Sequence, residues 1–242
     1  MENMRTKEET LKRIRGKIIV SCQGDPEVNP MGTPENLLLM ADCAARGGAA
    51  GFRANRPENI RLIKEAFPDL PMIGIWKIVT GDNPVYITPN MEAVDTLVDL
   101  GCEIVAIDGT DRINAAGKKA WQLLSEAKEK HPNTLIMADL ADIHDARMAV
   151  AAGADICSTT LSGYTDYTED KKGSCDFELV RQIRQEFPNM FIITEGKIWS
   201  REDAMKAFDC GADAVVVGTA ITNPLSITER YVRSIDEHLS IP

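Results

Sequence analysis

The stretch CGADAVVVG, residues 210–218, decides the fold, because similar junctions recur along the whole chain. In each junction a glycine ends a segment of helical period, and a short apolar run follows almost at once. The others are RGGAAGFRA (46–54), LGCEIVAID (100–108) and AGADICSTT (152–160). Their spacing corresponds to about two strand–helix units. The chain is therefore predicted to repeat a βα unit.

A second kind of junction falls between these. It appears in FPDLPMIGI (67–75), HPNTLIMAD (131–139) and FPNMFIITE (187–195), and the first apolar run is KIIVSCQ (17–23). Together the two kinds give eight strands. At 242 residues the chain is close to the roughly 250 typical of a (β/α)₈ TIM barrel, which is the predicted fold. A doubly wound open sheet is the competing architecture, although no G-x-G-x-x-G follows the first run.

No linker divides the chain, so we expect one barrel domain over residues 1–242. A short charged N-terminal extension is expected over 1–15 and a C-terminal helix over about 225–239. Between strands, the helix in segment 88–101 is predicted to hold Pro89 in its first turn. Another helix is predicted to begin at a capping box formed by Ser200 and Asp203.

Composition narrows the range of partners. The net charge is −10 and the isoelectric point about 4.9, which argues against nucleic acid or an anionic membrane surface as partner. The charged start of the chain lacks a signal-peptide core, and no apolar run approaches the roughly 20 residues of a membrane span, so a cytoplasmic location is expected. Six cysteines without a C-x-x-C pair suggest neither a zinc site nor disulfides.

Polar residues end nearly every predicted strand. They are Gln23, Arg53, Lys77, Asp108, Asp139 and Glu195. Each alone has an ordinary explanation, since strand ends meet solvent and ion pairs perturb groups without catalysing anything. In a TIM barrel, however, all these ends meet at one face, where active sites lie. Their convergence favours a functional site there.

The loops after the last two strands, EGKI and VGTAITNP, indicate a phosphate site. Gly196 and Gly218 let the backbone approach a ligand closely, with Lys197 and Thr219 beside them. TIM barrels commonly bind phosphate at this position through backbone N–H groups. A phosphorylated small molecule is the expected ligand.

From Gly16 onward the sequence resembles the N-acylglucosamine-6-phosphate 2-epimerase family, also called N-acetylmannosamine-6-phosphate 2-epimerase. The resemblance is carried, in order, by IVSCQ, GGAAGFRA, PMIGIWK, VYITP, AIDGT, MADL, CSTTLSGYT, TEGKI and VVVGTAIT. It implies a TIM barrel that converts N-acetylmannosamine 6-phosphate to N-acetylglucosamine 6-phosphate in sialic-acid catabolism. It also implies a homodimer that uses the C-terminal end of the chain.

The functional residues of the family can be matched to individual positions of this chain. The family's proton-transferring lysine corresponds to Lys77 and its assisting glutamate to Glu195. Its sugar-contacting residues correspond to Gln23, Arg53 and Asp139. After AIT the family usually has arginine, whereas this chain has Asn223. No cofactor is expected.

Other functions stay open at this stage. Lys77 could instead form a Schiff base in a sugar-phosphate lyase on the same barrel. A metal-dependent epimerase would need histidine ligands on the rim, but His131, His144 and His238 fall elsewhere, so no metal is expected. A catalytically silent sugar-phosphate binding protein is the alternative outside enzymology.

Overall fold

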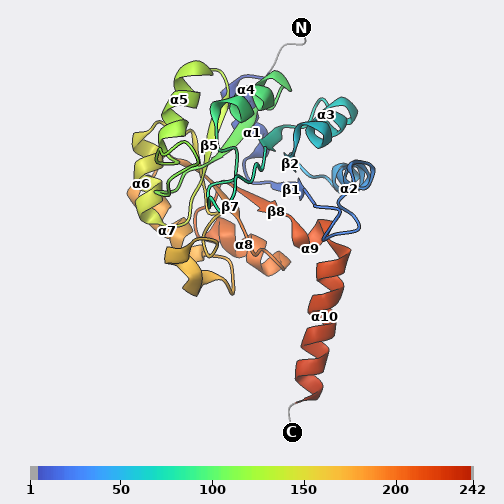
Figure 1. Ribbon diagram of the computed structural model, residues 1–242. Coiled ribbons are helices and arrows are strands. Elements are labelled where there is room, and N and C mark those ends of the chain that lie inside the picture. Colours follow the sequence, from blue (N-terminus) through green and yellow to red (C-terminus); the bar gives the residue numbers. More distant parts are fainter. Residues whose placement is uncertain (1–4, 241–242) are drawn as a thin grey trace.

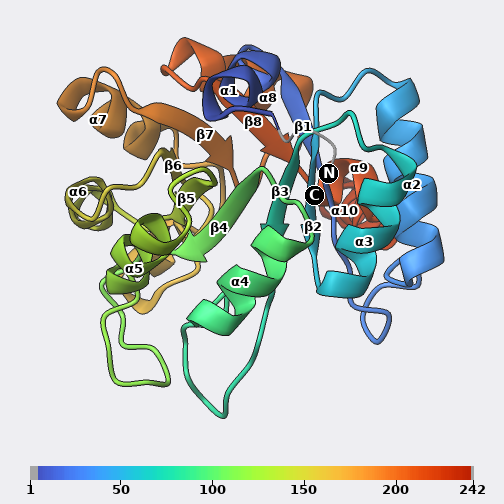
Figure 2. The ribbon, with the colours of Figure 1, turned by 90° about the horizontal axis from the view of Figure 1, so that it is seen from above.

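The computed structural model describes residues 5–240 and shows a closed parallel barrel of eight strands (Figures 1 and 2). Each strand pairs with its neighbour in chain order, and β1 closes the barrel by pairing with β8. The strands are β1 (Ile18–Cys22), β2 (Phe52–Asn55), β3 (Met72–Ile75), β4 (Ile104–Asp108), β5 (Leu135–Asp139), β6 (Ile156–Ser158), β7 (Phe191–Glu195) and β8 (Ala214–Val217). The predicted TIM barrel is confirmed, and the open sheet is wrong.

Helices surround the barrel. They are α2 (Pro34–Arg46), α3 (Pro57–Ala66), α4 (Met91–Asp99), α5 (Gln122–Lys130), α6 (Ile143–Ala151), α7 (Phe177–Glu186) and α8 (Arg201–Asp209), with a 3₁₀ helix η1 (Asp166–Lys171) and a short α9 (Thr219–Thr222). The predicted capping box of Ser200 and Asp203 is confirmed at the start of α8. The placement of Pro89 in a first turn is wrong. Asn90 accepts a hydrogen bond from the N–H of Ala93 and caps α4, so Pro89 lies before the helix.

Strand side chains alternate between two apolar cores. One set fills the barrel interior, including Ile73 and Ile75 of β3 and Leu135 and Met137 of β5. The alternate residues, such as Ile136, pack between the strands and the helices. This period of two follows from strand geometry. It also fixes which residue of each strand points into the mouth of the barrel.

Helix α1 (Lys7–Ile14) lies in the expected N-terminal extension, of which residues 1–4 are outside the described residues. Ile14 is fully buried in the interior core. Arg15 forms an ion pair with Asp213, which precedes β8, and its guanidinium lies 4.8 Å from the centre of the Phe191 ring. The helix therefore packs at the end of the barrel where the strands begin, and the opposite end remains free for a site.

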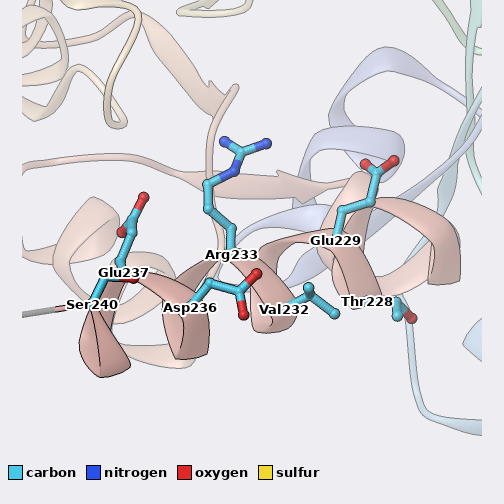
Figure 3. A pocket seen from close by; sticks show the side chains of 7 residues that line it. All are labelled: Thr228, Glu229, Val232, Arg233, Asp236, Glu237 and Ser240. Atoms are coloured by element: carbon cyan, nitrogen blue, oxygen red, sulfur yellow. The ribbon is translucent and has the colours of Figure 1, made fainter.

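The last helix, α10 (Pro224–Leu239), projects away from the barrel (Figure 1). A C-terminal helix was predicted here, with packing either on the barrel or on a partner. None of its residues is buried, so it does not close the barrel. The outward residues in Figure 3, from Thr228 to Ser240, come from this helix and its end alone. One helix cannot enclose a ligand, so this is an open face.

Within residues 5–240, the structure contains no helix with the length and apolar character needed to cross a membrane.

Candidate active site

A cavity of about 630 Å³ opens at the carboxyl ends of the strands. This size is within the range of small-molecule sites, roughly 300–1,000 Å³. Eight of the nine predicted site residues line it: Gln23, Arg53, Lys77, Glu195, Gly196, Lys197, Gly218 and Thr219. The ninth, Asp139, is fully buried and bonded to Arg53. The structure thus brings all nine together.

The alternation of the strands explains why these side chains meet. In β5 the inward residues are Leu135, Met137 and then Asp139. In β7 the interior residues Phe191 and Ile193 are followed by Glu195. A charged residue thus ends an otherwise apolar inward row, and several such ends converge at the barrel mouth.

Arg53 links two carboxylates at the base of the cavity. Its Nη1 and Nη2 donate to Oδ1 and Oδ2 of Asp139 at 3.1 and 2.6 Å, and Nη1 also donates to Oε2 of Glu195 at 2.6 Å. The side chain is only 1% exposed. Burial disfavours the charged guanidinium, but the two carboxylates outweigh this effect and raise the pKa of Arg53. Arg53 is therefore a fixed cation.

Thr160 completes this network and was not predicted from the sequence. Its Oγ1 lies 2.7 Å from Oδ1 of Asp139 and 3.3 Å from Oε2 of Glu195. Ser158 in turn lies 2.8 Å from the Thr160 hydroxyl. Both residues continue the inward row of β6 that starts at Ile156, and that alternation is the signal that could have found them.

Glu195 is a largely buried carboxyl with a strongly perturbed pKa. Burial raises the pKa of Glu195 to about 7, against the opposing effects of Arg53 and Lys77. Near neutral pH this carboxyl can therefore gain or lose a proton, which an ordinary glutamate with a pKa of about 4.3 cannot readily do. Such a group suits proton transfer or the tuning of a nearby base.

Lys77 is held by its backbone while its side chain stays free. Its N–H donates to Oδ1 of Asn55 at 2.9 Å, and the residue bridges to Ile87 of the following loop. Among the described residues, its ammonium has no hydrogen-bond or ion-pair partner, and solvent reaches it through the cavity. The surrounding protein and the Arg53 cation lower the pKa of Lys77, while Glu195 opposes this. More of the neutral amine is thus present near pH 7 than for a free lysine.

Gln23 offers an unused acceptor to the cavity. Its Nε2 donates to the Ser21 hydroxyl at 2.7 Å, whereas its Oε1 is buried and has no donor within the described part of the chain. A buried polar atom without a partner is costly, so a ligand hydroxyl or amide N–H at this point would be stabilised.

The two glycine loops present backbone donors. Across residues 5–240, the N–H groups of Gly196, Lys197, Thr219 and Ala220 have no hydrogen-bond partner. Gly196 has a φ of +102°, which only glycine adopts readily. Such free N–H groups at the mouth of a barrel can bind an anion.

Two side chains beside these loops are already bonded to protein atoms. The ammonium of Lys197 donates to the carbonyl oxygens of Ser162 and Lys171 at 2.5 and 2.9 Å. Asn223 accepts a hydrogen bond from the N–H of Ser226 and so caps α10. The backbone, rather than these side chains, therefore dominates this end of the cavity.

No group of three or more His, Cys, Asp or Glu residues is arranged to hold a metal ion in the region from residue 5 to 240. His131, which precedes β5, bonds to Asp95 at 2.7 Å, and His238 lies on α10.

Residues 37–237 match the family model described as "Putative N-acetylmannosamine-6-phosphate epimerase". Among individual proteins, the chain is 42% identical over 227 residues to a putative N-acetylmannosamine-6-phosphate 2-epimerase of Caldanaerobacter subterraneus subsp. tengcongensis, covering 94% of each chain. It is 39% identical to a protein of the same description from Clostridioides difficile, covering 93% of this chain and 99% of that one.

A solved structure agrees with these matches. The N-acetylmannosamine-6-phosphate 2-epimerase from Clostridium perfringens superimposes with a TM-score of 0.85 at 37% identity, covering 92% of this chain and 95% of that one. Since the family model spans most of the chain and the relatives exceed 30% identity over nearly all of it, the chain belongs to the N-acetylmannosamine-6-phosphate epimerase family.

Proposed function

We propose that the protein is an isomerase that converts N-acetylmannosamine 6-phosphate to N-acetylglucosamine 6-phosphate by epimerisation at C2. The observation that carries this proposal is that one cavity holds Lys77, Glu195 and two glycine loops, where the Lys77 ammonium and several loop N–H groups have no partner among residues 5–240. Family membership supports the same reaction.

Epimerisation needs a base that removes the proton next to the carbonyl of the open-chain sugar. We assign this step to the neutral amine of Lys77. The C2–H electron pair then forms a C1–C2 double bond, and negative charge develops on the C1 oxygen. The fixed cation of Arg53 and the newly formed Lys77 ammonium stabilise that charge. The Lys77 ammonium then returns a proton to C2 after the intermediate has rotated to present its opposite face, which restores the carbonyl and gives the epimer.

Glu195 assists Lys77 through its charge. Burial lowers the pKa of Lys77 and the Arg53 cation lowers it further, while the carboxylate of Glu195 opposes both effects by favouring the ammonium form. Thr160 and Arg53 both bond to the carboxylate of Glu195 and so fix the position from which it acts on Lys77. Acid–base catalysis by one positioned group typically contributes about 10²- to 10⁴-fold.

The remaining residues hold the substrate. Gln23, through its unused Oε1, and the Arg53–Asp139 pair bind the polar groups of the sugar. The phosphate binds to the loops that contain Gly196, Lys197, Gly218 and Thr219. Lys197 takes part mainly through its backbone N–H, because its ammonium is bonded to two carbonyls.

We also propose a homodimer formed through α10. Its large apolar residues Tyr231, Ile235 and Leu239 are 70%, 55% and 75% exposed and recur at intervals of four, which places them on one side of the helix. An exposed apolar stripe of this kind is typical of a protein–protein interface. A cytoplasmic location and a role in sialic-acid catabolism fit a phosphorylated amino-sugar substrate.

The reaction is tested by incubating the protein with N-acetylmannosamine 6-phosphate in D₂O and following C2 by NMR. We expect the epimer to appear with deuterium at C2, and the unphosphorylated sugar to react far more slowly. A Schiff-base lyase would instead cleave the sugar and be trapped on Lys77 by borohydride. Binding without turnover would indicate a sugar-phosphate binding protein.

A further inference from the structure

Four cationic side chains line the cavity. The surroundings of three of them have been described above. Arg53 is bonded to Asp139 and Glu195, and Lys197 is bonded to two backbone carbonyls. Lys77 lies close enough to Arg53 for that cation to lower its pKa. The fourth is Arg56, which the sequence-based prediction did not include.

Arg56 has donors available for a ligand. Its guanidinium has no hydrogen-bond partner within the described range, and the nearest carboxylate oxygen, Oδ2 of Asp25, is 3.9 Å away. The side chains of Arg56 and Asp25 are 40% and 48% exposed, so this contact is weak and screened by water. Arg56 therefore keeps most of its capacity to bind an anion.

The backbone holds Arg56 at a defined point of the cavity. The residue follows β2 directly and precedes Pro57, the first residue of α3. Its N–H donates to the carbonyl of Ile75 at 3.1 Å. Its φ of +75° lies in the region that favours glycine. This backbone conformation is unfavourable for an arginine but would not be for a glycine.

The phosphate loops lie within reach of this position. Strand β1 pairs on one side with β2 and on the other with β8, and Gly218 and Thr219 follow β8 directly. Two strand spacings separate β2 from β8, or about 9–10 Å. Figure 2 shows α3 and α9, which follow these two strands, on the same side of the barrel. A long arginine side chain extending over β1 can thus approach an anion bound at Thr219.

We propose that Arg56 binds the phosphate group of the substrate and makes the enzyme specific for phosphorylated over unphosphorylated sugar. The inference rests on the proposed function for the identity of the sugar. The unoccupied N–H groups of the two loops bind one side of the phosphate monoester, and the guanidinium binds the other by charge-assisted hydrogen bonds.

The test compares Arg56→Gln and Arg56→Gly with the wild type by calorimetric titration with inorganic phosphate, N-acetylmannosamine 6-phosphate and N-acetylmannosamine. The glycine variant relieves the positive φ, so its fold is expected to be at least as stable as the wild type. Arg61→Gln is the matched control, because it removes an equal charge from an exposed position on α3, the helix that Arg56 precedes.

Both Arg56 variants are expected to bind the two phosphate-containing ligands about tenfold or more weakly, with unchanged binding of the unphosphorylated sugar and no effect of Arg61→Gln. The inference is overturned if affinity changes less than twofold, if Arg61→Gln weakens binding equally, or if the wild type binds neither phosphate compound. Because binding is measured, sugar-phosphate affinity without turnover would contradict the proposed reaction while leaving the role of Arg56 intact.

Discussion

The guanidinium of Arg53 forms a two-point ion pair with the carboxylate of Asp139, with Nη1–Oδ1 and Nη2–Oδ2 distances of 3.1 and 2.6 Å. Both side chains are almost completely buried, and one nitrogen of the same guanidinium also bonds to Glu195. Arg53 therefore neutralises Asp139 and positions Glu195 in one arrangement. The floor of the proposed active site and part of the stability of the barrel mouth therefore both depend on Arg53.

Replacing Arg53 by methionine should strongly destabilise the protein. The substitution leaves Asp139 and Glu195 buried without their cation, and breaking a buried ion pair typically costs about 3–5 kcal/mol. Urea unfolding at neutral pH measures the loss. The penalty should shrink as pH falls, because the carboxyls become protonated and no longer carry a buried charge.

Arg147→Met is the control for this change. Arg147 also forms a two-point pair, with Glu186, but both side chains are well exposed. Little or no change in stability is expected there. An equally small effect of Arg53→Met would contradict the structural importance given to the buried network.

Replacing Lys77 by alanine should abolish catalysis without affecting the fold. Its ammonium has no partner among residues 5–240, so its loss leaves no buried group unpaired and the thermal midpoint should not change. Epimerisation and deuterium incorporation at C2 should both fall by at least about 10²- to 10⁴-fold. Exchange that persists in this variant while epimerisation stops would assign the first proton transfer to Glu195 instead.

The pH dependence of kcat/KM should show the raised pKa of Glu195. Since burial raises this pKa to about 7, the protonated form predominates below neutrality and the ionised form above it. If the ionised form positions Lys77, kcat/KM should rise with pH through about 7. An unperturbed glutamate would place this rise near 4.3.

Glu195→Gln isolates this effect. The variant should have a lower kcat/KM, and its pH profile should lack the rise near pH 7. The substrate phosphate, whose second pKa is about 6, titrates identically in both proteins and does not disturb the comparison. A limb that stays near 7 in the variant would show that another group of the enzyme controls the rate.

The recurring glycine junctions were sufficient to predict the barrel, because each marks a helix end and the start of a buried strand. The position of the site could then be predicted, because the carboxyl ends of all the strands meet at one face of a TIM barrel. Thr160 was missed because it lies in the turn just after β6, although it continues the inward alternation that starts at Ile156. Arg56 was missed because it lies beyond the end of β2 at Asn55, in the connection to α3, and so belongs to no strand pattern.

Local sequence signals were less reliable at the ends of the helices. Both Pro89 and Asn90 are favourable near a helix start, and only the hydrogen bond from Ala93 to Asn90 shows which of them marks it. For α10, periodicity indicated an apolar stripe but not what covers it. The direction in which the helix leaves the barrel depends on tertiary structure that no local pattern encodes.

Introducing charge into the α10 stripe should convert the proposed dimer to a monomer. In Tyr231→Asp/Ile235→Asp, two carboxylates replace apolar side chains that are 70% and 55% exposed in the single chain. Because neither side chain is buried within the chain, the monomer should still fold. Burial of these carboxylates against a second copy would be costly, so association should be lost. Sedimentation velocity measures the change.

Arg233→Asp is the control. Arg233 lies on nearly the opposite side of the helix from these two positions, so its replacement should leave the dimer largely intact. A wild-type protein that sediments as a monomer, or a dimer that survives the double substitution, would contradict the proposed interface.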